Sequence, residues 1–206
     1  MDLLIKRLVN KPVDSNCFVL YKKDSSQCII IDPGTEDCAD LIDFLKEKKL
    51  SPSYIILTHE HFDHIWGVNK LRNEFNCQLI CSDECNRNII DKKRNLSVFY
   101  NQQSFQTDLA DISIESINYQ LHWEGFSFKF LKTPGHSKGS ISIFVEDNFF
   151  CGDLIIKNVE TVTKLPGGNN EELKRSLDFI FNNTDYIKSV VYPGHGSIFK
   201  LKELKN

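Results

Sequence analysis

Short apolar runs separated by turn residues recur along the chain, and most have the length and β-branched content of strands. The run at Cys28–Ile31 is apolar throughout, which is typical of a strand that is buried on both faces. The predicted strands are Leu3–Val9, Cys17–Tyr21, Cys28–Ile31, Tyr54–Leu57, Gln78–Cys81, Phe126–Leu131, Ser140–Glu146, Phe149–Cys151 and Ser189–Tyr192.

Helical spacing of apolar residues appears between several of these strands. The predicted helices are Glu36–Lys48 with Thr35 as its cap, Trp66–Phe75, Glu171–Phe181, and one that Ser82 caps and that runs into Lys92–Arg94. Because strands and helices alternate without a linker or a repeat, we predict one domain of mixed α and β structure over residues 1–206.

Two segments show neither the strand pattern nor the helix pattern of apolar residues. Residues 95–123 are rich in Asn, Gln and scattered aromatic residues. They could cover a substrate, but an edge hairpin is the simpler interpretation. Residues 200–206 form a charged stretch that we expect to fray from the domain.

Composition narrows the function class. The 206 residues are 41% hydrophobic and carry a net charge of −3, so the chain lacks the basic surface of nucleic-acid-binding proteins. The apolar start is too short for a signal peptide, and no run could cross a bilayer, so we expect a soluble cytoplasmic protein without a membrane partner. The seven cysteines show no paired framework, and we expect small buried thiols. Nothing indicates the oligomeric state.

The densest polar cluster is Thr58–His64, which contains three histidines and two carboxylates directly after the strand predicted at Tyr54–Leu57. Imidazole and carboxylate are the ligands that borderline divalent metals prefer. The helical zinc motif of metalloproteases needs a histidine four residues after His59, where this chain has Asp63. A metal site is therefore favoured, and a helical metalloprotease is disfavoured. Glu60 is interpreted as a solvated or supporting carboxylate.

Three further candidate ligands also follow predicted strands. His136 and His195 each come after a Pro-Gly turn, and Asp153 comes two residues after Cys151. The carboxyl ends of strands are common places for sites in layered α/β proteins. A lone histidine is more often structural, but five histidines and two aspartates in matching contexts favour a metal centre. His122 falls outside this pattern and is interpreted as a surface or interface histidine without an assigned role.

In chain order, these seven candidate ligands are His59, His61, Asp63, His64, His136, Asp153 and His195. Their pattern resembles the metallo-β-lactamase superfamily and, within it, the short single-domain glyoxalase II (hydroxyacylglutathione hydrolase) branch. The resemblance extends from Asn16–Leu20 and Ile31–Gly34 to Tyr192–Gly196. It implies an α+β fold, a four-layer αββα sandwich with two metals at one edge. Asp153 disfavours a true β-lactamase, where other residues usually serve the second metal.

The resemblance also implies a role for each ligand. His59, His61 and His136 would hold one metal, Asp63, His64 and His195 would hold the other, and Asp153 would bridge them. Zinc is the preferred metal, with iron or manganese as alternatives. Two cations about 3.5–4 Å apart lower the pKa of a shared water to about 7, and the resulting hydroxide could attack a small thioester or ester. Asp63 and Asp153 are the catalytic candidates.

The substrate pocket is expected to differ from that of known relatives. Thr161–Lys164 stands where short members carry Gly-Arg-Thr-Asp, and the chain after His195 is too short for the helical region that binds glutathione in two-domain enzymes. Phe62 and Lys138 are tentative contacts of a small-molecule substrate because they adjoin ligands. Trp66, Phe99 and Tyr100 are further pocket candidates, but for all the aromatic residues core packing is the preferred interpretation.

Two other functions remain open on the same fold. A mononuclear iron persulfide dioxygenase would need only His59, His136 and Asp153. A non-catalytic member would bind a metal or a small ligand without turnover.

Overall fold

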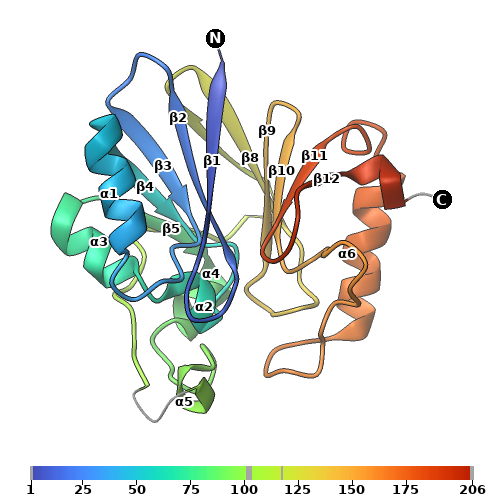
Figure 1. Cartoon of the computed structure of the whole chain (residues 1–206). Helices are drawn as coiled ribbons and strands as arrows, with labels where there is room; N and C mark the ends of the chain where they lie inside the picture. Colours follow the sequence, from blue (N-terminus) through green and yellow to red (C-terminus); the bar gives the residue numbers. More distant parts are fainter. Residues whose placement is uncertain (1, 101–103, 117, 205–206) are drawn as a thin grey trace.

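The computed structural model describes residues 2–100, 104–116 and 118–204, which form two six-stranded sheets packed face to face with helices outside them (Figure 1). The first sheet contains β1 (Leu3–Val9), β2 (Asn16–Lys22), β3 (Gln27–Ile31), β4 (Ser51–Ile56), β5 (Gln78–Ser82) and β6 (Ile112–Ile114) in that order. The second contains β12 (Phe199–Lys200), β11 (Val190–Pro193), β10 (Asn148–Gly152), β9 (Ile141–Val145), β8 (Phe126–Lys132) and β7 (Asn118–Trp123).

Alternation along the strands divides the apolar residues between separate cores. In β3, Ile29 and Ile31 pack in the core between the two sheets, whereas Cys28 and Ile30 pack under the helices of the first sheet. A third core lies between the second sheet and its covering helix and contains Phe149. The continuous apolar strand is therefore buried on both faces, as predicted, and the four-layer αββα sandwich is confirmed.

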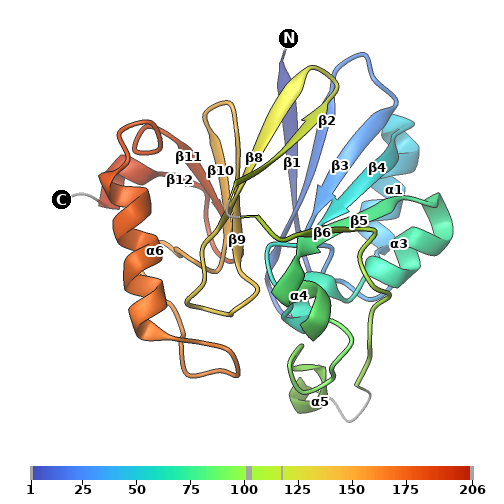
Figure 2. The same ribbon diagram turned by 180° about the vertical axis from the view of Figure 1, so that it is seen from behind.

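The outer layers are short helices. In Figures 1 and 2, α1 and α3 cover the first sheet and α6 covers the second. The helices are α1 (Ala39–Lys48), α2 (Phe62–Ile65), α3 (Val68–Phe75), α4 (Asp83–Asn88), α5 (Ser97–Tyr100), α6 (Asn170–Asn182) and the 3₁₀ helix η1 (Leu201–Leu204). No helix of these described ranges has the length and apolar character that a bilayer crossing needs.

Tertiary contacts shift several predicted helix boundaries. Thr35 does not cap α1, because its hydroxyl accepts from the backbone N–H of Lys11 and donates to Asn10. The helix predicted from Trp66 is wrong in its first turn, since α3 begins at Val68. These boundaries follow from contacts with other segments.

The next helix is predicted better at its start than at its end. Ser82 caps α4 as expected, accepting a hydrogen bond from the Cys85 N–H, but the helix ends at Asn88, well before Lys92–Arg94. Its start is set by a local cap, which a sequence pattern can show.

The edge hairpin predicted within residues 95–123 is wrong. β6 pairs in parallel with β5 at the edge of the first sheet, whereas β7 pairs antiparallel with β8 in the second. The chain therefore crosses from one sheet to the other in this segment. The tail prediction is also wrong over η1, because Leu201 is fully buried in the core under α6, and residues 205–206 lie outside the described residues.

Strand direction brings the candidate ligands to one edge of the sandwich. β3 and β4 run in parallel in the first sheet, and β8, β10 and β11 share one direction in the second. A hydrogen bond of 2.8 Å from the Ile141 N–H to the Thr58 carbonyl joins the two sheets at this edge. All seven cysteines are buried and free, in agreement with the expectation from composition.

Candidate metal centre

The first group of ligands has its imidazoles facing one another. One ring nitrogen from each of His59, His61 and His136 lies within 4.8 Å of the others, and His136 Nε2 is 2.9 Å from His61 Nδ1. The outer nitrogens of two rings are occupied, because His59 Nδ1 is 3.0 Å from the Thr58 hydroxyl and His136 Nδ1 is 2.8 Å from the Val162 carbonyl. These outer contacts fix the ring orientations and direct Nε2 of both residues inward.

The second group is built in the same way. The inward atoms are His64 Nε2, which lies 3.4 Å from His195 Nε2, and Asp63 Oδ2, which lies 3.2 Å from His195 Nε2. On the outer side, His64 Nδ1 is 3.0 Å from Asp32 Oδ2, and His195 Nδ1 is 3.1 Å from the Asp14 carbonyl. Again, one nitrogen of each ring is held by the protein and the other is directed inward.

Asp153 lies between the two groups. Its Oδ2 is 3.5 Å from both His136 Nε2 and His195 Nε2, and its Oδ1 is 3.7 Å from His64 Nε2. The close approach depends on Gly194, where a Cβ would overlap Asp153 Oδ1 and lie 2.8 Å from His64 Cε1. The Pro-Gly turn before His195 therefore leaves space for the central carboxylate.

The local backbone explains how adjacent residues reach different positions. His61 is extended, with φ −67° and ψ 143°, and α2 begins at the next residue. Asp63 and His64 therefore project from one short helical turn. The Ser15 hydroxyl donates to the Asp63 carbonyl at 2.5 Å and holds this helical turn against the start of β2.

Asp32 is a positioning residue that sequence reasoning missed. It is buried, its Oδ1 accepts from the Thr58 N–H at 2.7 Å, and its Oδ2 accepts from the Thr58 hydroxyl at 2.6 Å while contacting His64 Nδ1. It also lies within 4.8 Å of His59 and His64 ligand atoms, but both of its oxygens are already engaged. The available signal was its place at the end of β3, the parallel neighbour of β4.

Glu60 is a supporting carboxylate, one of the two interpretations that the sequence allowed. Only 1% of the residue is exposed, so the solvated interpretation is wrong. Its Oε1 accepts from Asn88 Nδ2 and its Oε2 accepts from the Ser137 hydroxyl, each at 2.8 Å. These bonds tie the loop of His59 and His61 to the loop that carries His136.

Asn16 performs a similar task for the loop of His195. Its side-chain amide donates to the carbonyls of Pro193 at 2.8 Å and Gly196 at 3.0 Å, and its backbone N–H donates to Gly194 at 2.6 Å. Residues from β2 thus fix a loop more than 170 positions later in the chain. The sequence could not show this pairing because it depends on how the sheets meet.

The first ligand group is electrostatically suited to be neutral. Burial lowers the pKa of His59 and His61 well below the usual imidazole value, and the charges of neighbouring histidines lower both values further. Neutral imidazoles keep the lone pairs that a metal needs.

The second group combines opposite charges. Burial disfavours the charged form of His64, but Asp63, Asp153 and Asp32 outweigh it and raise the pKa of His64 to about 10. Burial would raise the pKa of Asp63, but His64 and His195 hold that pKa below its usual range. A cation here would compensate the same carboxylates in place of the proton on His64.

Buried polar atoms without hydrogen-bond partners indicate whether these residues could bind a metal ion. Within the described residues, His59 Nε2, His61 Nε2 and Asp153 Oδ1 are buried and have no hydrogen-bond partner. Such atoms are costly to bury unless something binds them. His59 Nε2 belongs to the first ligand group, Asp153 Oδ1 lies 3.7 Å from His64 Nε2 of the second, and His61 faces His136 through Nδ1. Because the inward atoms are imidazole nitrogens and carboxylate oxygens, the site fits divalent metal ions.

The tentative substrate contacts lie near the centre in different settings. Phe62 is half-buried and stacks on Tyr100, with ring centroids 4.7 Å apart. Lys138 is mostly exposed and its Nζ lies 3.4 Å from Glu84 Oε1. Core packing is wrong for Phe99 and Tyr100, which are 71% and 41% exposed. His122 is exposed, as expected.

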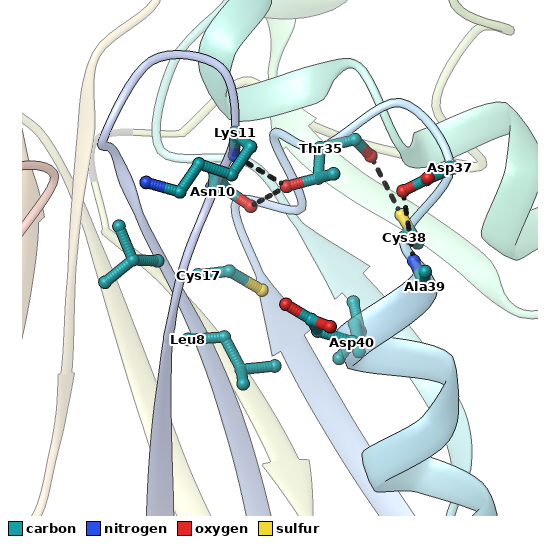
Figure 3. Close-up of a pocket in the computed structure, with 11 residues that line it drawn as sticks. Leu8, Asn10, Lys11, Cys17, Thr35, Asp37, Cys38, Ala39 and Asp40 are labelled. Carbon is teal, nitrogen blue, oxygen red and sulfur yellow. Dashed lines mark hydrogen bonds between the residues drawn. The ribbon is translucent and has the colours of Figure 1, made fainter.

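A separate cavity of about 250 Å³ lies beside the start of α1 (Figure 3). Its polar side chains bond within the wall: the Cys38 thiol contacts the Thr35 carbonyl, and Asp37 accepts from the Ala39 N–H. Asn10 connects this wall to the metal centre by donating to the Asp32 carbonyl at 3.1 Å. The polar groups of this cavity are therefore engaged within the protein, and Asn10 of its wall supports the backbone at Asp32.

Comparison with known proteins places this geometry in a family. The sequence model of the metallo-beta-lactamase superfamily matches residues 10–195, which include all seven candidate ligands. The chain belongs to the metallo-beta-lactamase superfamily.

Two curated members of the superfamily illustrate the range of relatives. The probable metallo-hydrolase YqgX of Bacillus subtilis is 33% identical over 84% of this chain and 81% of its own length. The hydroxyacylglutathione hydrolase GloC of Haemophilus influenzae is 27% identical over 88% and 85%, respectively. Among solved structures, BLEG-1 B3 metallo-beta-lactamase has a TM-score of 0.89 and 31% identity, covering 98% of this chain and 97% of that one. Membership supports a metal-dependent, hydrolase-type enzyme.

Proposed function

We propose that this protein is a hydrolase with two divalent metal ions that cleaves a small thioester or ester. The observation that carries the proposal is the position of Asp153, whose carboxylate lies between two complete ligand groups. A one-metal site would need only the group on one side of this carboxylate. The names of the relatives YqgX and GloC support a hydrolase, and GloC's name supports a thioester substrate.

The seven ligands have distinct proposed roles. His59, His61 and His136 would hold the first metal, Asp63, His64 and His195 would hold the second, and Asp153 would be shared between them. When bound, such a pair supplies a water of lowered pKa and polarises a carbonyl oxygen. The all-nitrogen-and-oxygen ligand set suits zinc, and it also accommodates iron or manganese.

The protein supplies orientation and proton acceptance. Buried imidazoles of the first group exclude bulk water on one side, whereas His195, with 26% of its side chain exposed, marks the side open to substrate. No described residue forms a hydrogen bond with Asp153 Oδ1, so this atom can orient a water molecule and accept its proton. Cys151 is a poor alternative nucleophile because burial raises the pKa of its thiol.

The test combines metal content with a substrate panel. Purified protein is loaded with zinc, iron or manganese, and metal ions per chain are measured by mass spectrometry. Hydrolysis of thioesters, esters and a β-lactam is then followed, the last because of the similarity to BLEG-1. We expect two ions per chain and turnover of a thioester or ester.

Matched carboxylate variants identify the centre responsible. Asp153→Asn is expected to lower kcat/KM at least about 100-fold, whereas Asp178→Asn, on the exposed face of α6, leaves it unchanged. A single iron with oxygen uptake on a persulfide would replace the proposal with a dioxygenase. Full metal loading without turnover of any substrate would instead support a non-catalytic member.

A further inference from the structure

An apolar cavity of about 380 Å³ opens beside the metal centre. Its wall comes from the segment around α5 and from the loop at residues 165–168, and its lining residues are Phe62, Leu96, Phe99, Tyr100, Leu165 and Pro166. Phe62 lies in sequence between the candidate ligands His61 and Asp63. The cavity therefore shares one wall residue, Phe62, with the loop that carries ligands of both groups.

The aromatic part of this wall is held in place by its neighbours. Phe62 stacks on Tyr100, whose ring forms a T-shaped pair with Trp66, with ring centroids 5.6 Å apart. Trp66 in turn stacks on Phe105, with ring centroids 5.4 Å apart. A backbone hydrogen bond of 2.8 Å from the Phe62 N–H to the Asn95 carbonyl joins the ligand loop to the α5 segment. The wall is thus built onto the metal centre by packing and by a backbone bond.

The same wall leaves large apolar side chains in contact with solvent. Phe99 is 71% exposed, Tyr100 41% and Leu165 37%. Exposed apolar patches beside a concave site are typical of ligand-binding surfaces. Burying these side chains against an apolar group would remove that exposure.

The lack of charge among the six lining residues indicates which kind of ligand the cavity can bind. None of the six lining residues is charged, and the nearby Lys138 ammonium is already paired with Glu84. A ligand with several carboxylates, such as a peptide thiol, would find no cation in this wall. An aliphatic or aromatic group would match it along its whole length.

We propose that this cavity binds the apolar acyl chain of the substrate, so that the enzyme prefers thioesters or esters of medium-length or aromatic acids to those of small polar acids. The proposal rests on the proposed hydrolase function. In the bound state, the carbonyl carbon lies at the metal centre and the acyl chain extends past Phe62 toward Phe99. The hydrolysis product is then a carboxylic acid whose tail occupies the same cavity.

Product binding tests the cavity without relying on turnover. Affinities of straight-chain carboxylates from acetate to octanoate are measured by calorimetry for zinc-loaded and metal-free protein. Each added methylene is expected to tighten binding about fourfold until the cavity is filled, because burying one CH₂ in an apolar site has that effect. The same dependence should appear in both metal states, since the lining is apolar in each.

An exposed aromatic pair supplies the matched variants. Phe99→Ala should weaken octanoate binding about tenfold or more relative to acetate and should lower the octanoyl-to-acetyl ratio of kcat/KM for thioesters. Phe179→Ala removes a side chain that is 53% exposed on α6, outside the cavity, and should change neither quantity. Because both rings are largely exposed, both variants should fold.

Several outcomes would overturn the cavity assignment. Affinity that is independent of chain length would do so, as would equal effects of Phe99→Ala and Phe179→Ala, or a length dependence on the leaving-group side alone. Chain-length-dependent binding that Phe99→Ala abolishes, in a protein without any hydrolysis, would support the cavity while rejecting the proposed reaction. Hydrolysis with no acyl-length preference would support the reaction and reject the cavity.

Discussion

Replacing Glu60 should weaken both the fold and the first metal site. Its carboxylate is buried and accepts one hydrogen bond from Asn88 and one from Ser137. Hydrogen bonds to charged groups contribute about 1.5–3 kcal/mol each to stability. Glu60→Ala removes both bonds, so we expect the free energy of unfolding to fall by about 3–6 kcal/mol, a large part of a typical 5–15 kcal/mol total.

Glu60→Gln is a finer perturbation because it keeps the shape. The amide oxygen can still accept from Asn88, while its NH₂ group faces Ser137. The Ser137 hydroxyl can rotate to accept from this NH₂ and donate to Ser140 Oγ, which lies 3.0 Å away. We therefore expect a loss of only about 1–2 kcal/mol and a zinc affinity lowered about tenfold at the first site, as for other residues that orient metal ligands.

Urea unfolding and zinc competition with a coloured chelator measure these two effects. Glu47→Gln, an exposed glutamate on α1, is the control and should match the wild type in both assays. A wild-type urea midpoint together with unchanged zinc affinity for Glu60→Ala would refute the supporting role of Glu60. Equal losses of stability and zinc affinity in Glu60→Gln and Glu60→Ala would refute the role assigned to its two hydrogen bonds.

Four further predictions follow from the same contacts. Asp32→Asn should lower the affinity of the second metal about 10- to 100-fold by removing the charge beside His64 Nδ1, and metal analysis should find one ion retained. Gly194→Ala should lose metal and activity together, because the added Cβ overlaps Asp153; wild-type metal content would contradict this. A chelator should lower the melting temperature, because a metal that binds only the folded state, at a free concentration 100 times its Kd, adds about 2.7 kcal/mol to the free energy of unfolding; an unchanged melting temperature would refute this. Thiol reagents should label native protein slowly and denatured protein fully, because all seven thiols are buried and burial raises the pKa of Cys28 to about 12; rapid labelling of native protein would contradict that burial.

Elements with a clear local period could be predicted with accurate bounds. Leu3–Val9 forms β1 with the predicted limits, and Glu171–Phe181 lies within α6. The residues that follow strands were also readable, because a run that ends abruptly in histidine or aspartate is a local pattern. The candidate ligands could therefore be named from the sequence, and their order carried the resemblance to the family, which in turn implied the sandwich.

Contacts between distant segments decided the rest. Pairing assigned β6 and β7 to different sheets, although they are close in sequence, because strand pairing is a non-local choice. Burial likewise showed that Glu60 supports two ligand loops and is not a solvated carboxylate, and hydrogen bonds gave Asp32 a role that the sequence did not show.

Sequence alone determined which ligand types this protein has and that strand ends would deliver them, since both depend on residue identity and local period. Tertiary structure alone decided which atoms converge. It placed Asp153 between the two groups and formed the apolar cavity from Phe62 and the distant Leu165. The physical reason is that burial, ring orientation and cavity shape arise only when segments far apart in the chain pack together.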